Sequence, residues 1–345
     1  MITRVSRSKA LTTALLGVTL GLMNCITQAA TATPSEDDIK TYLRPMEVPQ
    51  PKSNLSTPER VELGKHLFFD PRLSGSGWIS CATCHNPALG WSDGLPTAIG
   101  HGMQVLGRST PTILNIAYQK SQFWDGRAAT MEEQALGPIQ AEPEMAGNME
   151  NVIRDLSDLP MYRKMFDTAY PGQGITNDTI AKAIATFERT VVSSDSPFDL
   201  WLKGQNTMSV AAVRGFDLFK GKANCAACHS GFNFTDNGFH NIGLPNNTDA
   251  GRFAIKPIKV MKGAFKTPTL RDAALTPPYM HNGQYKSLEE VVDHYNNGGT
   301  PTFDNLDPNM KKLDLSKQEK KDLVEFLKSL TGSPLMITYP QLPVK

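Results

Sequence analysis

Two copies of one short motif constrain this chain more than any other feature. The motifs use four of the five cysteines in 345 residues, and they read Cys81-Ala-Thr-Cys84-His85 and Cys225-Ala-Ala-Cys228-His229. C-x-x-C-H is the signature of covalent c-type haem attachment, because its thiols form thioethers with one porphyrin and its histidine binds the iron. Two disulfides, a zinc site or a thioredoxin-like redox pair are the alternatives. We predict two covalently bound haems.

The first 32 residues have the order of a secretory signal. Arg4, Arg7 and Lys9 precede an apolar run over residues 10–23, and small residues follow it. The run is short for a transmembrane span, and no later stretch is apolar enough to cross a membrane. We therefore predict a signal peptide over 1–32 and export of the mature protein. A retained anchor, or a lipoprotein anchor at Cys25, is the alternative.

The charge balance argues against one class of partner. The chain has 35 basic and 34 acidic side chains, and its hydrophobic fraction of 40% is ordinary for a globular protein. Binding to nucleic-acid phosphates needs a basic surplus or a basic stripe, and the sequence has neither. We expect no nucleic-acid partner.

The chain has the pattern of a duplication. A Gly-x-x-Leu-Phe segment begins at Gly64 before the first motif and at Gly215 before the second. Apolar residues recur at helical spacing over 180–191 and 323–330, and strand alternation is nearly absent. We predict a mainly α fold with two cytochrome c-like domains, residues 33–200 and 201–345, with long loops between their helices.

Six further segments carry a family resemblance. The chain resembles the bacterial dihaem cytochrome c peroxidases, including their MauG-like relatives, which oxidise tryptophan in a partner protein. Beside the two motifs, the segments that carry the resemblance are Gly100-His101-Gly102, Thr110–Asn115, Phe123–Arg127, Glu142–Met145, Thr267–Arg271 and Thr276–His281.

The resemblance implies roles for residues of the first half. His85 would be the proximal ligand of the haem that meets hydrogen peroxide, and Glu144 the acid–base carboxylate of its distal pocket. Peroxide cleavage needs such a group, because a proton moves from the near oxygen to the leaving one. Gln134 falls at a distal amide, and Trp124 at an indole between the haems on the electron path. By composition alone, Glu144 would be an ordinary loop carboxylate and Trp124 a core aromatic.

The sixth ligands of both irons are also implied by the resemblance. His101 falls where a histidine ligates the peroxidatic iron in the resting enzymes of the family; a surface histidine on a mobile loop is the alternative. His229 would hold the second iron from one side. Tyr295 stands where donor-dependent peroxidases carry a methionine and the MauG-like branch a tyrosine. Tyr295 also belongs to an apolar helical stripe, so that it could be a core residue, and Met280 is then the fallback ligand.

The family binds one calcium ion between its domains. The resemblance implies that the carbonyl oxygens of Thr276 and Pro278 are ligands, since calcium prefers hard oxygen donors. An asparagine of the family site is Ser109 in this chain, which makes the side-chain contact doubtful.

Three functions are compatible with this sequence. The first is a periplasmic reductase of hydrogen peroxide that takes electrons from a small cytochrome c or copper protein. The second is a MauG-like oxidation of tryptophan in a protein substrate, and the third is a dihaem electron carrier. Tyr295 favours the second, whereas Ala223 occupies the place of the tryptophan through which MauG oxidises its partner. Trp78, Trp91 and Trp201 are the tryptophans that could substitute. We rank the reductase first, and a homodimer is one assembly that the sequence leaves open.

Overall fold

The structure is a computed structural model, and it describes Met1 and residues 33–344. The predicted signal peptide lies outside the described residues and stays a prediction. No helix within residues 33–344 is both long and apolar enough to span a bilayer.

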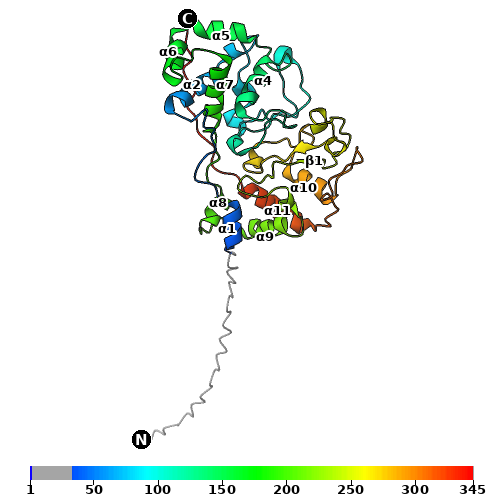
Figure 1. Cartoon of the computed structure of the whole chain (residues 1–345). Coiled ribbons are helices and arrows are strands. Elements are labelled where there is room, and N and C mark those ends of the chain that lie inside the picture. Colours follow the sequence, from blue (N-terminus) through cyan, green and yellow to red (C-terminus); the bar gives the residue numbers. More distant parts are fainter. Residues whose placement is uncertain (2–32, 345) are drawn as a thin grey trace. The chain divides into compact units, whose positions relative to one another are not determined.

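The fold is mainly helical, which confirms the predicted class (Figure 1). One pair of two-residue strands, β1 (Phe239–His240) and β2 (Phe265–Lys266), runs antiparallel in the second half. Short 3-10 turns and long loops connect the α-helices, which are α1 (Glu36–Tyr42), α2 (Pro58–Phe69), α3 (Cys81–Cys84), α4 (Met131–Gln140), α5 (Met149–Ser157), α6 (Pro160–Ala169), α7 (Asn177–Glu188), α8 (Pro197–Leu202), α9 (Val210–Lys220), α10 (Leu288–Asn296) and α11 (Lys317–Ser329).

Each half is built on one pair of packed helices, α2 with α7 and α9 with α11. The first core gathers Leu63 and Phe68 of α2 around Phe187 of α7. The second gathers Phe216 of α9 around Phe326 of α11, with ring centroids 5.1 Å apart. Each pair brings the helix that precedes a Cys motif against the last long helix of its half, so both motifs start from equivalent scaffolds.

The glycine shared by the two halves has a packing role. A β-carbon on Gly64 would lie 1.9 Å from the carbonyl oxygen of Ala183 in α7. A β-carbon on Gly215 would lie 2.0 Å from the carbonyl oxygen of Asp322 in α11. Both helix pairs therefore approach so closely at this point that only glycine fits. The repeat seen in the sequence is a repeat of helix crossings.

Side-chain caps fix where the helices begin. The Thr57 hydroxyl accepts the Arg60 amide at the start of α2. Ser316 and Glu319 form a reciprocal capping box at the start of α11. At α10, Ser287 caps the Glu290 amide, but the Glu290 carboxylate accepts from Lys286 instead of Ser287.

Each end of the described chain packs against the opposite half of the molecule. Tyr42 of α1 belongs to the second core and stacks on Phe234 at 5.0 Å between ring centroids. In return, Tyr339 near the C-terminus packs against Phe69 of α2 at 5.1 Å. The boundary predicted at 200/201 stays a prediction, and the two crossings tie the halves together on both sides of it.

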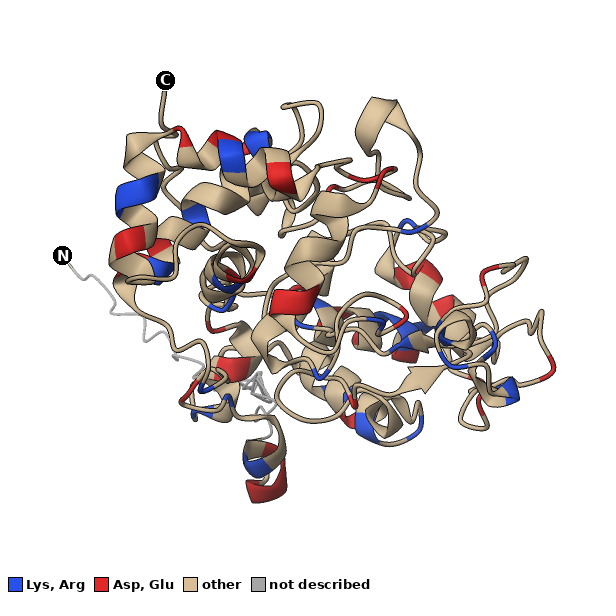
Figure 2. Ribbon diagram, turned by 45° about the horizontal axis from the view of Figure 1, so that its top comes forward, with Lys and Arg blue, Asp and Glu red and all other residues tan. Residues whose placement is uncertain are grey.

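Charged residues of both signs are interspersed along the ribbon (Figure 2). Among the described residues, most ion pairs keep at least one partly exposed side chain, but one pair is fully buried: Arg271 Nη1 lies 2.7 Å from Asp199 Oδ2, with both side chains at most 1% exposed. Arg271 also donates to the Phe232 carbonyl oxygen and packs over the Phe232 ring. This pair links α8 to the loop that precedes α10.

Candidate functional site

Both Cys motifs open into one continuous cavity. Its wall includes the two cysteines and the histidine of each motif, contributed by both halves of the chain. The first motif forms the short helix α3, and the second forms a 3-10 turn after α9. Two sites that are 144 positions apart in sequence therefore share one interior space.

Both motif histidines are oriented for metal binding. His85 Nδ1 lies 3.2 Å from the Trp91 carbonyl oxygen, and His229 Nδ1 lies 2.8 Å from the Phe234 carbonyl oxygen. An Nδ1–H donated to a carbonyl leaves the Nε2 lone pair free for iron. Burial lowers the pKa of both histidines, which favours the neutral form that binds a metal. The residues present therefore fit the attachment of a haem at each motif.

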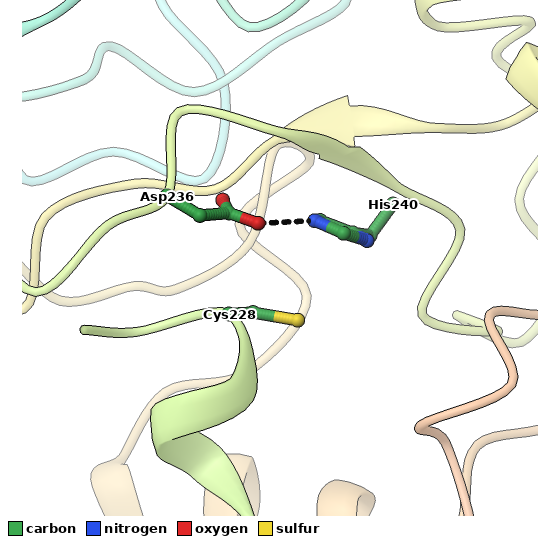
Figure 3. Close-up of side chains that lie close together, drawn as sticks. All are labelled: Cys228, Asp236 and His240. Carbon is green, nitrogen blue, oxygen red and sulfur yellow. Dashed lines mark hydrogen bonds and ion pairs between the residues drawn. The ribbon is translucent and has the colours of Figure 1, made fainter.

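The alternatives to haem attachment find little support in the geometry. All four motif cysteines are free of disulfides. Among the described residues, one cluster of side chains has the spacing of a metal site, Cys228 with Asp236 and His240 (Figure 3). Its sulfur belongs to the second motif, where thioether formation uses it, so we do not assign a separate metal to this cluster.

His240 has a carboxylate partner at each of its two ring nitrogens. Its Nε2 is 2.8 Å from Asp236 Oδ2, and its Nδ1 is 2.6 Å from Asp307 Oδ2. Figure 3 marks the contact with Asp236. The Cys228 sulfur and these two carboxylates raise the pKa of His240 to about 10. Because a carboxylate faces each ring nitrogen, the imidazolium form is favoured even when Cys228 is a thioether.

Glu144 lies on the cavity wall, in the turn after α4. Its side chain is 30% exposed, and burial raises the pKa of its carboxyl group, whereas the charge of Arg127 opposes that rise. Arg127 Nη2 is 4.0 Å from Glu144 Oε1, and Arg127 also bonds both carboxylate oxygens of Asp125. A carboxyl group with a raised pKa at a cavity wall is suited to accept and return a proton.

Three buried side-chain oxygens at the cavity lack protein partners among the described residues, and one of them is Oε1 of Gln122. The other two are Oε1 of Gln134, on α4, and Oε2 of Glu188, at the end of α7. Burial raises the pKa of Glu188 to about 8. Unsatisfied buried polar atoms are costly, so their presence on this wall indicates a site that is completed by a ligand or by water.

Trp124 lines the cavity and is held at both its side chain and its backbone. Its Nε1 donates to the Ser109 carbonyl oxygen at 2.9 Å, and its own carbonyl accepts from the Lys266 amide at 2.8 Å. Ser109 belongs to the first half of the chain and Lys266 to the second. The indole is therefore fixed at the junction of the two halves, beside the cavity that both motifs share.

His101 is near this site, but its ring is not part of the cavity wall. Its backbone amide donates to the Glu144 carbonyl oxygen at 2.8 Å, and its buried Nδ1 has no partner among the described residues. The loop that carries His101 thus packs on the backbone of the loop that carries Glu144. Ligation of the first iron by His101 stays a prediction.

Tyr295 and Met280 both reach the cavity. Tyr295, on α10, is half-buried, and the burial of its phenol, together with the charges of Cys225 and Cys228, raises the pKa of this group. The phenol is therefore close to the second motif. Met280 has a left-handed backbone with φ of 74°. The choice of Tyr295 over Met280 as a ligand stays a prediction.

The residues expected to bind calcium lie together only in part. Thr276 and Pro278 line the same cavity as Ser109. The Ser109 carbonyl accepts from Trp124, and the Ser109 amide donates to the His281 carbonyl oxygen at 2.7 Å. The backbone of Ser109 is thus already used, and the calcium site stays a prediction.

Sequence reasoning did not single out Arg127, Glu188 or Lys266, which also line the cavity. Arg127 belongs to a segment that carries the family resemblance. Its proximity to Glu144 comes from the folding of the chain between the two residues, which the sequence does not show. Glu188 follows Phe187 in an apolar helix. From the sequence, a charged residue there would be expected on the solvent-exposed face of the helix. Burial lowers the pKa of Lys266 to about 7, and its Nζ donates to Gln119 and to the Ser121 carbonyl oxygen. No local pattern marks a buried lysine of this kind.

Comparisons with known proteins agree with this geometry. Residues 58–207 match the family described as di-haem cytochrome c peroxidase, and residues 212–331 match cytochrome c. The chain is 49% identical to the methylamine utilization protein MauG of Methylorubrum extorquens over 322 residues, which cover 91% of each protein. It is 36% identical to the cytochrome c551 peroxidase of Pseudomonas aeruginosa, with 93% of each covered. A solved MauG-like protein associated with microbial copper homeostasis superposes with a TM-score of 0.79 at 33% identity, covering 84% of this chain and 95% of that one.

Proposed function

Since the chain belongs to the di-haem cytochrome c peroxidase family, and is thus an oxidoreductase with two haem c groups, we propose that it reduces hydrogen peroxide to water with electrons from a small redox protein. One observation carries the proposal: Glu144, Gln134 and Trp124 line the cavity into which both Cys motifs open. A simple electron carrier has no use for a proton-handling carboxyl group there.

The protein residues handle protons and position the substrate. When bound at the first motif, the haem supplies the iron that binds peroxide and exchanges electrons with it. Glu144 accepts a proton from the near oxygen of peroxide and returns it to the leaving oxygen. Gln134 offers its unpaired amide oxygen to accept a hydrogen bond from the substrate, and the Arg127 charge favours the carboxylate form of Glu144. Two electrons and two protons then complete the conversion of one peroxide into two waters.

Electrons would enter at the second motif and pass Trp124 on their way to the first. Support comes from the rigid hold on this indole, between the Ser109 carbonyl and the Lys266 amide. A fixed aromatic ring between two redox groups shortens the gaps that electrons must cross.

Oxidation of tryptophan in a protein partner is the second candidate. Tyr295 on the wall beside the second motif supports it, because an anionic oxygen ligand stabilises oxidised iron. The relative named MauG also supports it. Ala223 argues against it, since an alanine that is 6% exposed offers no aromatic relay at that point.

Two further parts of the proposal concern location and metal content. We propose export to the periplasm, on the basic, apolar and small-residue order of residues 1–32. We also propose one calcium ion held by the Thr276 and Pro278 carbonyl oxygens. N-terminal sequencing of the mature protein tests export, and elemental analysis of the purified protein tests calcium.

Steady-state peroxide consumption with a reduced monohaem cytochrome or a small copper protein tests the main proposal. We expect sustained turnover that rises with donor concentration and falls at least about tenfold in Trp124→Phe. Trp201→Phe is the matched control, because Trp201 is buried in the second core away from the cavity wall. If no donor supports turnover, while a periplasmic protein gains oxygen mass on tryptophan, the second candidate is correct and the reductase is wrong.

A further inference from the structure

One of the four tryptophans is almost fully exposed to solvent. Trp78 is 86% exposed, whereas Trp91 is 1% exposed and Trp201 is 4% exposed. The fourth, Trp124, lines the cavity. Tryptophan is the largest side chain and is mostly buried in globular proteins, so a nearly free indole is unusual.

The backbone that presents Trp78 is ordered by a local hydrogen-bond network. The Ser74 hydroxyl donates to the Pro71 carbonyl oxygen at 2.8 Å and accepts from the Ile79 amide at 3.2 Å. The Ser74 carbonyl accepts from the Gly77 amide at 3.2 Å, and Gly77 has a left-handed φ of 69°. The turn is thus closed on both sides of Trp78, and the indole is held outward by a defined loop.

This loop touches the first site at two places. Ile79, Ser80 and Cys81, which directly follow Trp78, all line the cavity. Cys81 is three positions after Trp78, so their α-carbons are at most about 11 Å apart. On its other side, the Gly75 amide donates to the Met145 carbonyl oxygen at 2.9 Å, next to the distal Glu144.

The surroundings of Trp78 indicate the kind of reductant. Residues 73–80 read Leu-Ser-Gly-Ser-Gly-Trp-Ile-Ser and carry no charge, so the loop offers nothing to steer a charged protein. The glycines and serines before Trp78 leave the ring open to a second ring, which would stack on it. A small neutral aromatic molecule fits such a surface.

We propose that Trp78 is a surface oxidation site at which neutral phenols give electrons to the haem of the first motif, without passage through the second. Each phenol loses one electron and one proton to become a phenoxyl radical. Two phenols and one hydrogen peroxide then give two phenoxyl radicals and two waters. This inference rests on the proposed peroxide chemistry at the first motif, but not on the electron route from a protein donor.

Two variants test the redox role of the ring against its shape. We expect Trp78→Phe to lower the rate of peroxide-dependent phenol oxidation at least about tenfold, because phenylalanine is hard to oxidise. Trp78→Tyr should keep more of this rate, and turnover with a cytochrome donor should be unchanged in both variants. Tyr339→Phe is the control, since Tyr339 is 60% exposed on the same half of the molecule. Equal phenol oxidation by Trp78→Phe and the unaltered protein would overturn the proposal.

Peptide mass analysis gives a second readout that does not depend on steady-state turnover with an added reductant. After treatment with peroxide and no reductant, we expect oxygen mass on Trp78, little on Trp201, and protection by added phenol. The gain should slow in Glu144→Gln, which separates oxidation through the site from direct attack on an exposed ring. The proposal would be contradicted if Trp78 gained as much oxygen mass in Glu144→Gln as in the unaltered protein. If phenol oxidation depends on Trp78 but no protein donor supports turnover, the inference stands and the proposed donor route fails.

Discussion

The Arg127 guanidinium lies between the distal carboxylate and an aromatic face. Its Nη2 is 4.0 Å from Glu144 Oε1, and its central carbon is 3.4 Å from the centroid of the Phe123 ring. Asp125 accepts two hydrogen bonds from the same guanidinium. The charge that opposes the effect of burial on Glu144 is therefore fixed in place.

Removal of this charge should shift the pH profile. In Arg127→Leu the pKa of Glu144 rises further, because burial then acts without opposition. The carboxylate form is needed to accept the first proton, so the acidic limb of the profile of peroxide turnover should move to higher pH. Arg154→Leu removes an equal charge at an exposed ion pair and should leave the limb in place. An unmoved limb in Arg127→Leu would show that Arg127 does not tune Glu144.

Loss of the carboxyl group itself should have a larger effect. Glu144→Gln keeps the shape of the side chain but removes the base, and peroxide turnover should fall about a hundredfold or more. Glu142→Gln, two residues earlier and exposed, is the matched control and should retain the rate. Full turnover in Glu144→Gln would mean that another group handles the protons.

The ligand of the second iron can be identified by paired substitutions. If Tyr295 is the ligand, Tyr295→Phe should change the spin or ligand state of that haem, as seen in absorption and EPR spectra, with the covalent haem content intact. Met280→Leu should then leave the spectra unaltered. The reverse pattern would assign the site to Met280.

Much of the fold and of the haem sites could be predicted, because these features depend on the spacing of residues close together in the sequence. Thioether chemistry fixes the C-x-x-C-H interval, and apolar periodicity marks the helices, so the mainly α class and the family were predicted and are confirmed. Contacts between distant segments leave no such signal. Arg127 meets Glu144 only through the turn after α4, and Asp199 meets Arg271 across the second half. The crossing of the two chain ends, through Tyr42 and Tyr339, is equally invisible in the sequence.

The buried ion pair should be important for stability. Asp199→Ala leaves the Arg271 charge buried and unpaired, which typically costs about 3–5 kcal/mol of unfolding free energy. The double variant Asp199→Leu with Arg271→Met should recover most of that loss, because no charge is left unpaired. Lys312→Ala breaks a pair that is exposed on both sides and should hardly change the thermal midpoint. Thermal unfolding followed by circular dichroism measures all three. A midpoint for Asp199→Ala equal to that of Lys312→Ala would refute the role assigned to the pair.

The shared glycine should resist substitution by alanine. In Gly64→Ala the new methyl group meets the Ala183 carbonyl oxygen, and overpacking of this kind costs about 1–3 kcal/mol. Gly107→Ala is the control, since a β-carbon there meets no atom within 4 Å. Urea unfolding of the two variants should separate them, and equal stability would mean that α2 and α7 can move apart freely.

The central claim is that electrons held at the second motif reach peroxide at the first. A stopped-flow experiment in which the fully reduced protein is mixed with one equivalent of peroxide tests it most directly, because each haem then carries one electron. We predict that both haems are oxidised together, with none left reduced, and that oxidation of the second haem slows in Trp124→Phe but not in Trp201→Phe. If the second haem stays reduced after the peroxide is consumed, electrons do not pass between the motifs and the proposed function is wrong.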